Sequence, residues 1–220
     1  DYELRRPDQT SAALDRAMVL AMSEPRGPIY MTLPREVLAA PAAPAALAPA
    51  TTPASAPGAD PDSIAAAADL LAGAKAPLII TTTVGRYANA VPALAGLADA
   101  FAIPVVAHWP RYLCLTTDHP MHAGFTPGPA LKDADVVLVV DSDVPWIPAI
   151  EEPATNTKVV QLGIDPLYVD YPMRTFAADV VINAHPVTGM SALHNALADR
   201  IDTKSADISA RRKTLAVAHT

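Results

Sequence analysis

The sequence predicts an α/β fold in which a parallel β-sheet is covered by helices, preceded by the end of a different α/β unit. Three observations lead to this prediction. Short apolar segments alternate with amphipathic ones along residues 61–202. Residues 39–60 are almost only Ala, Pro, Thr and Ser, a composition that keeps a chain extended and indicates a linker between two units. Residues 28–36 form a strand-like run, Pro-Ile-Tyr-Met-Thr-Leu-Pro-Arg-Glu, that closes the first unit.

The first unit, residues 1–38, is predicted to contain one helix and one strand. Apolar residues recur at helical spacing over residues 8–22, with Asp8 or Thr10 available as a cap and Pro25 beyond the end. This helix leads into a strand at 28–33. The chain opens with Asp1 rather than Met, and we expect it to be a segment of a larger multidomain protein.

The second unit is predicted to alternate helices and strands. Helices are expected at 61–73, 87–102 and 185–201, with a short one before the third strand, and strands at 77–82, 104–107, 135–140, 158–163 and 178–182. Short apolar strands separated by helices are typical of a parallel sheet with both faces covered. Since crossovers are right-handed, the expected architecture is a doubly wound, Rossmann-like sandwich. Residues 203–220 are expected to be polar, helical or unstructured, and to connect to something further on.

Composition excludes several classes of function. The net charge is −7 and no stretch is dense in Lys or Arg, which argues against nucleic acid and anionic membrane surfaces as partners. The single cysteine, Cys114, cannot form an internal disulfide, and no apolar run approaches the roughly twenty residues that span a bilayer. No signal peptide is visible in the segment, so we expect a cytoplasmic protein.

Five stretches, in this order, resemble one family. Residues 16–18 and 24–38 are similar to the end of the pyrimidine-binding domain of thiamine-diphosphate-dependent enzymes such as acetolactate synthase and benzoylformate decarboxylase. Asp118-His119-Pro120, residues 134–138 and Ile164-Asp165-Pro166 resemble successive landmarks of the central domain of that family. The order and spacing of these stretches carry the resemblance, which covers most of residues 1–202.

The resemblance implies a three-domain subunit in which thiamine diphosphate and Mg²⁺ bind between the first and third domains of two different subunits. Residues 1–38 would end the pyrimidine-binding domain, 39–60 would be the linker, 61–202 the central domain and 203–220 the start of the link to the diphosphate-binding domain. The glutamate that activates the cofactor would precede Asp1, and the Gly-Asp-Gly…Asn motif would follow Thr220. No catalytic residue and no metal ligand is therefore expected in this segment, and the full-length enzyme is expected to be a homodimer or homotetramer acting on a 2-oxo acid.

Some members of the family bind FAD or the ADP part of an activator in the central domain, and the first strand-to-helix turn is where a phosphate would lie. This turn, residues 81–87, offers Thr82, Gly85 and Arg86 as candidate ligands. The alternative is a helix start with threonine capping and one glycine for the turn. FAD-binding members differ from this chain at residues 123–129 and 141–148, which weakens the case for FAD and for a biosynthetic acetolactate synthase.

Two carboxylates, Asp141 and Asp143, follow the predicted strand at 135–140. If the backbone stays extended, both point the same way and could bind a cation or ribose hydroxyls. Alternatively they cap the turn while Trp146 packs beneath it. Asp165, after a later strand, either starts a turn or contacts an adenosine.

The long loop after the second strand of this unit carries Trp109 and Arg111. Aromatic residues together with arginine are common at buried interfaces, so we expect an interdomain contact by these residues and Trp146, with stacking on a ligand as the alternative. Cys114 lacks a basic activator and is predicted to be a packed thiol. His119 and His122 lack a third ligand for a metal site.

Two functions fit these patterns. The first is the central domain of a thiamine-diphosphate- and Mg²⁺-dependent enzyme, an acetolactate synthase-like decarboxylase or carboligase, in which this segment organises the assembly. The second is a stand-alone nucleotide-binding module for FAD, ADP or NAD. The second explains residues 60–202 but assigns no role to the first 38, and the Gly-x-Gly-x-x-Gly turn typical of dinucleotide sites is missing.

Overall fold

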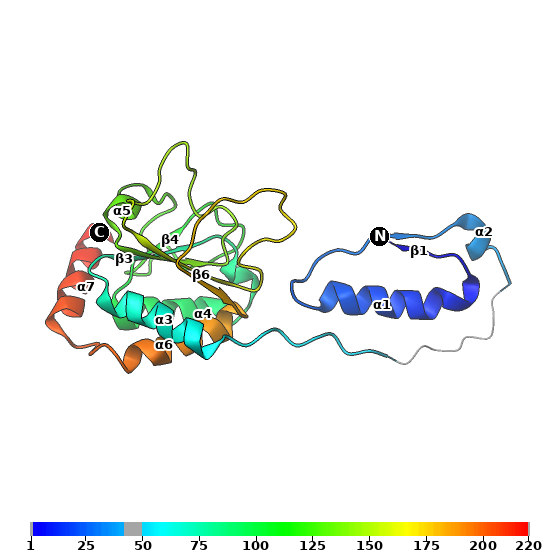
Figure 1. Ribbon diagram of the computed structural model, residues 1–220, viewed down its shortest axis with the longest axis horizontal. Helices are drawn as coiled ribbons and strands as arrows, with labels where there is room; N and C mark the ends of the chain where they lie inside the picture. Colours follow the sequence, from blue (N-terminus) through cyan, green and yellow to red (C-terminus); the bar gives the residue numbers. More distant parts are fainter. Residues whose placement is uncertain (1, 42–49, 220) are drawn as a thin grey trace. The chain divides into compact units, whose positions relative to one another are not determined.

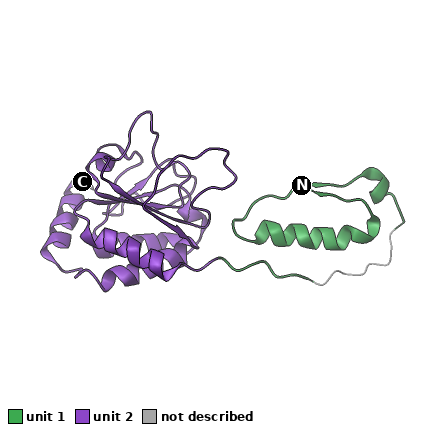
Figure 2. Cartoon of the chain, in the orientation of Figure 1, with its two compact units in different colours: residues 1–56 green, residues 57–220 purple. Residues whose placement is uncertain are grey.

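The computed structural model describes residues 2–41 and 50–219 of the 220-residue chain. The chain divides into two compact units, residues 1–56 and 57–220 (Figure 2). The predicted linker at 39–60 lies partly outside the described residues, at 42–49, and residues 50–60 contain neither helix nor strand. Among the described residues, no helix combines the length and the apolar character that crossing a membrane requires.

The first unit is a helix beside a small parallel sheet (Figure 1). A 3₁₀ turn, η1 (Pro7–Gln9), leads into α1 (Thr10–Met22), so the predicted helix is present. Strand β1 (Tyr2–Glu3) pairs with β2 (Met31–Thr32), and a short α2 (Arg35–Leu38) follows. Many large apolar side chains of this unit are exposed, namely those of Leu14, Met18, Leu20, Met22, Ile29, Tyr30, Leu33 and Leu38.

The second unit is built on a five-stranded, all-parallel sheet with the order β4-β3-β5-β6-β7. Each predicted strand is present: β3 (Pro77–Thr81), β4 (Val105–Ala107), β5 (Val136–Val140), β6 (Lys158–Gly163) and β7 (Val180–Asn183). Every residue of β3, β4 and β5 is buried, which explains why these strands are continuous apolar runs. The doubly wound, Rossmann-like fold is thereby confirmed.

Helices cover the two faces of this sheet unequally. On one face, α3 (Pro61–Gly73), α4 (Ala90–Phe101) and α6 (Pro186–Ala198) form the main core with the strands (Figure 1). The other face is covered by the short α5 (Gly128–Asp133) and by two aromatic side chains from irregular segments, Trp146 and Phe176. Their rings meet edge to face with centroids 5.2 Å apart.

The ends of two helices show how local sequence sets the boundaries. Helix α3 begins at Pro61 because the Asp60 carboxylate accepts a hydrogen bond from the Ser63 N–H at 2.8 Å. The last helix, α7 (Ala206–His219), packs on the second unit: Ile208 is buried, and Arg211 donates hydrogen bonds to backbone carbonyl oxygens at the end of α4. Whether α7 leads to a further domain stays a prediction.

The strand order places a topological switch point at β3. The chain passes from β3 to β4 on one side and then returns to β5 on the other. In open parallel sheets, ligands bind beyond the carboxyl ends of the strands at such a point. The loops that follow β3 and β5 are therefore the first place to look for a functional site.

Candidate functional site

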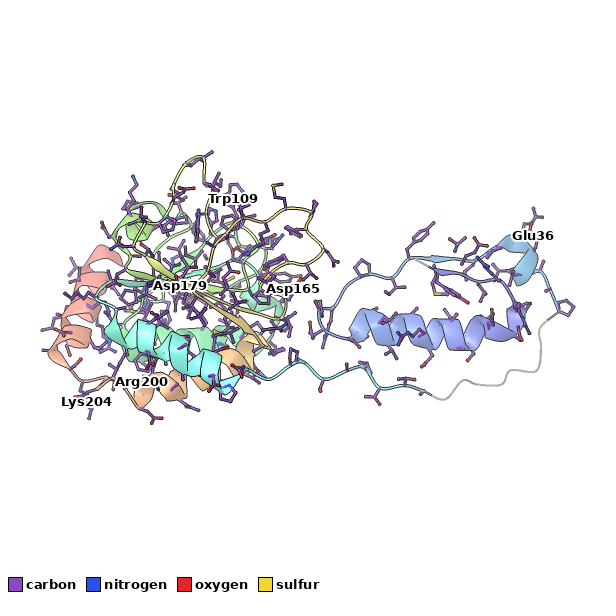
Figure 3. The ribbon with its side chains drawn as sticks, viewed as in Figure 1. Glu36, Trp109, Asp165, Asp179, Arg200 and Lys204 are labelled. Carbon is purple, nitrogen blue, oxygen red and sulfur yellow. The ribbon has the colours of Figure 1, made fainter. Side chains whose placement is uncertain are left out.

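The candidate site is the carboxyl edge of the sheet, by which we mean the loops that follow β3, β4, β5 and β6. Nearly all residues predicted as ligands or contacts lie on these loops, and Trp109 and Asp165 are labelled on two of them in Figure 3. The edge is therefore rich in polar side chains. Their partners decide whether the edge is open to a ligand.

Direct hydrogen bonds join the loops after β3 and β5 across the switch point. The Thr83 N–H donates to the Asp141 carbonyl oxygen at 3.1 Å, and the Thr83 hydroxyl lies 2.7 Å from the same oxygen and 2.9 Å from the Asp141 carboxylate. The hydroxyls of Thr82 and Ser142 share a further bond of 2.6 Å, and both side chains are buried. Thr82 thus holds the two loops together.

Gly85 is covered by the loop after β4. A Cβ atom added to Gly85 would lie 1.9 Å from the carbonyl oxygen of Leu113, so only glycine allows the two backbones to approach this closely. The turn itself is a 3₁₀ helix of three residues, η2 (Val84–Arg86). Arg86 Nε lies 3.3 Å from the Asp141 carboxylate. Gly85 and Arg86 are therefore both in contact with other residues of this chain, Gly85 with Leu113 and Arg86 with Asp141.

Asp141 and Asp143 do not point the same way, contrary to the expectation from an extended backbone. Asp141 has a φ of +49°, a left-handed conformation that aspartate tolerates better than most residues. Its carboxylate faces Arg86, whereas the carboxylate of Asp143 accepts hydrogen bonds from Arg111 Nη2 and from the Tyr171 hydroxyl, both at 2.8 Å.

The partners of Asp143 determine its ionisation. Burial alone would raise the pKa of the Asp143 carboxyl, but the hydrogen bonds from Tyr171 and Arg111, together with the positive charge of Arg111, outweigh burial and lower it. The bond to Asp143 is also the main reason why the pKa of Tyr171 is raised. At neutral pH the Asp143 carboxyl group is therefore ionised, and it is bound by the guanidinium group of Arg111 and the hydroxyl of Tyr171.

The lowered pKa of Asp143 predicts how stability depends on pH. A carboxylate whose pKa is lower in the folded state stabilises the fold above its unfolded pKa of about 3.9, and this contribution is lost as pH falls through the folded pKa. We expect Asp143→Asn to be less stable than wild type at neutral pH. The difference in unfolding free energy should shrink as the pH is lowered from about 7 to about 3, measured by urea denaturation. A constant difference across this range would contradict the assignment.

Sequence reasoning missed the residues that complete this edge. Gln161, in the middle of β6, is buried, and its amide oxygen accepts a hydrogen bond from Arg174 Nη1 at 3.0 Å. Arg174 also donates to the backbone carbonyl oxygens of Asp143 and Ser142. A polar residue inside an otherwise apolar strand was the available signal for Gln161, whereas nothing local singles out Arg174.

The remaining predicted residues have separate roles. The Asp165 carboxylate accepts hydrogen bonds from the Val169 N–H, which is a turn-capping arrangement. Trp109 is 61% exposed and stacks on His108, with ring centroids 5.1 Å apart. Trp146 does not face outward as an interface residue would, because it is 5% exposed and packs beneath the sheet against Phe176.

The cavity left at this edge is small. It measures about 10 Å³ and is lined by Val139, Asp141, Ser142, Gln161, Leu162, Gly163, Pro166 and Tyr168. A single water molecule needs roughly this much space, whereas sites for small molecules commonly measure about 300–1,000 Å³. This cavity therefore has room for about one water molecule and none for a nucleotide.

No metal centre is present in the described part of the chain, where no group of three or more His, Cys, Asp or Glu residues could hold an ion. The Nδ1 atoms of His119 and His122 accept backbone N–H bonds from Met121 and Gly124, respectively. Cys114 is buried, and burial raises the pKa of its thiol, as expected for a packed side chain. That thiamine diphosphate and Mg²⁺ bind outside this segment stays a prediction.

Comparisons with known proteins agree with this fold. A family model described as the central domain of thiamine pyrophosphate enzymes matches residues 64–193. Oxalyl-CoA decarboxylase of Escherichia coli K12 is 30% identical over 175 residues, which are 77% of this chain and 31% of that enzyme. 2-Hydroxyacyl-CoA lyase 1 of Dictyostelium discoideum is 28% identical over 151 residues, 66% of this chain and 26% of that enzyme.

Solved structures show the same relationship. The crystal structure of benzoylformate decarboxylase from Polynucleobacter necessarius superposes with a TM-score of 0.73 at 22% identity, over 93% of this chain and 39% of that one. The chain thus spans less than half the length of the relatives it matches. Because the family model covers more than half of the 220 residues, the chain belongs to the thiamine-diphosphate-dependent (thiamine pyrophosphate) enzyme family, with residues 64–193 matching its central domain.

Proposed function

We propose that this chain is the central part of a thiamine-diphosphate- and Mg²⁺-dependent enzyme that decarboxylates a 2-oxo acid, and that it acts there mainly as a structural and assembly domain. The match of residues 64–193 to the central-domain model carries this proposal. Two of the relatives are named decarboxylases and one is named a lyase, so cleavage next to a carbonyl has more support than acetolactate-type carboligation.

Within this enzyme the chemistry would come from the cofactor, which supplies a carbon nucleophile and an electron sink for decarboxylation. The described residues do not fit as its binding site, since the carboxyl edge is filled and no metal-binding cluster accompanies it. The role of this chain would be to hold neighbouring domains in place.

We further propose the domain organisation expected from the sequence, in which residues 1–38 end a pyrimidine-binding domain and 203–220 begin the link to a diphosphate-binding domain. The exposed apolar side chains of the first unit support the first part of this proposal, because its sheet of two strands leaves them uncovered. A homodimer or homotetramer of the whole enzyme is also proposed, and analytical ultracentrifugation would measure it.

An activity assay tests the proposed reaction. We expect the protein with its flanking domains to release CO₂ from a 2-oxo acid only when thiamine diphosphate and Mg²⁺ are both present, and residues 1–220 alone to give the background rate. Removing the metal with a chelator should abolish the activity, and adding Mg²⁺ back should restore it. Full activity after both cofactors are removed would exclude the proposal.

The alternative, a stand-alone nucleotide-binding module, has less support. A nucleotide would need a pocket at the carboxyl edge far larger than the cavity of about 10 Å³ found there. A stand-alone nucleotide-binding module would also leave the first unit without a function.

A further inference from the structure

The segment between β6 and β7, residues 164–179, differs from a usual crossover. The two strands are parallel neighbours, yet none of these residues forms a helix or a strand. The segment carries Tyr171 and Arg174, which bond to the loop after β5 and to Gln161 of β6, and Tyr168, whose ring lies against Arg174. We call it the strap, because it is fastened to the carboxyl edge by these residues.

Arg174 occupies a site whose atoms suit a planar guanidinium group. Its Nε donates to the Asp143 carbonyl oxygen at 3.0 Å, Nη2 to the Ser142 carbonyl oxygen at 3.2 Å and Nη1 to the Gln161 amide oxygen at 3.0 Å. Its Cζ atom lies 4.9 Å from the centre of the Tyr168 ring and 5.1 Å from that of Phe176. Three acceptors with two aromatic rings form a complete guanidinium-binding site.

The hydrogen bonds of Gln161 connect the guanidinium-binding site to the strap. Its side chain is 2% exposed, its amide oxygen accepts from Arg174, and its amide nitrogen donates to the Phe176 carbonyl oxygen at 3.1 Å. Both partners belong to the strap. Because a buried amide without partners is costly, Gln161 favours the closed strap over any open arrangement.

We propose that Arg174 is a built-in ligand of the carboxyl edge: the strap inserts a guanidinium group between the loop after β5 and strand β6 and so holds this part of the edge closed. Gln161 and Tyr168, which both contact Arg174, also line the cavity of about 10 Å³ at this edge. The inference rests on the structural role proposed above and is independent of the substrate.

Chemical rescue tests this inference on the chain of residues 1–220. Arg174→Ala removes the guanidinium group and should lower the melting temperature by about 6–12 °C, the loss expected for a partly buried, multiply bonded charge. Guanidinium chloride at about 50 mM, far below the molar concentrations that unfold proteins, should restore about half of this loss by occupying the vacated site. Urea or NaCl at the same concentration should restore none of it.

The matched control is Arg200→Ala. Arg200, which is labelled in Figure 3, follows α6. It pairs with Asp69 at 2.6 Å on the surface. Its removal should change the melting temperature little, and guanidinium should not raise it. Absence of rescue for Arg174→Ala, or equal rescue of the control, would overturn the proposal.

A second variant covers the case in which Arg174→Ala does not fold. Arg174→Lys keeps the positive charge but cannot reach two carbonyl oxygens and an amide in one plane, so it should remain clearly less stable than wild type. Wild-type stability of Arg174→Lys would overturn the proposal, because a charge alone would then suffice. Loss of the proposed enzyme activity would leave these melting results unchanged, so the two proposals fail separately.

Discussion

Replacing Gly85 with alanine will destabilise the second unit by about 3 kcal/mol, because the new Cβ atom meets backbone rather than a movable side chain. It would lie 1.9 Å from the Leu113 carbonyl oxygen and 2.7 Å from the Leu113 carbonyl carbon. The loop after β4 must then lift from the turn after β3. Thermal unfolding should show a melting temperature lower by about 6–12 °C.

Gly96→Ala is the matched control for this substitution. Gly96 lies within α4, and an added Cβ would meet nothing within 4 Å. Since alanine favours helix over glycine, this variant should be more stable than wild type by about 0.5–1 kcal/mol. If Gly85→Ala were as stable as Gly96→Ala, the close approach of the two loops would be refuted.

Replacing Asp141 with alanine should have the second large effect, a loss of about 2–4 kcal/mol. The side chain is 4% exposed and accepts a hydrogen bond from the Thr83 hydroxyl as well as facing Arg86. Breaking a buried pair costs about 3–5 kcal/mol, and the partial exposure of Arg86 reduces that figure. Equilibrium unfolding in urea would measure the loss.

Asp69→Ala provides the comparison on the surface. Asp69 pairs with Arg200 at 2.6 Å, but its side chain is 69% exposed. Exposed ion pairs contribute about 0–1 kcal/mol, so this variant should be near wild type. Equal losses for the two aspartates would mean that the bonds across the switch point contribute little to stability.

The elements of the second unit could be predicted because each has a local cause. Strands β3 and β5 are buried along their whole length and therefore appear as unbroken apolar runs. Helix α3 has the predicted limits, 61–73, and its start has a local cause in the Asp60 cap and in Pro61. Strand β1 could not be predicted, since two residues are too few to show any alternation.

The sequence indicated which loops carry the candidate site. It did not indicate which partners the side chains on those loops would bond. The ends of β3 and β5 come together because parallel strands end on the same edge, and this brings Thr82, Arg86 and Asp141 to one region. Their partners are set by contacts distant in sequence. Arg174 reaches Ser142 across 32 residues, and no local pattern encodes that contact.

The conformation of the aspartates illustrates the same limit. The prediction that Asp141 and Asp143 are parallel assumed an extended backbone, whereas Asp141 has a φ of +49°. This conformation is stabilised by bonds to the loop after β3, which lies 58 positions away. Local propensity permits a left-handed aspartate but does not require one.

The most direct test of the central claim is the change in melting temperature caused by nucleotides and by thiamine diphosphate. A ligand at a hundred times its dissociation constant adds about 2.7 kcal/mol, or about 5–11 °C for a domain of this size. We predict no change for residues 1–220 with ADP or FAD, and a rise for the protein with its flanking domains when thiamine diphosphate and Mg²⁺ are added. A saturable rise for residues 1–220 with ADP or FAD would contradict the account, because the carboxyl edge would then be a nucleotide site and not a closed structural one.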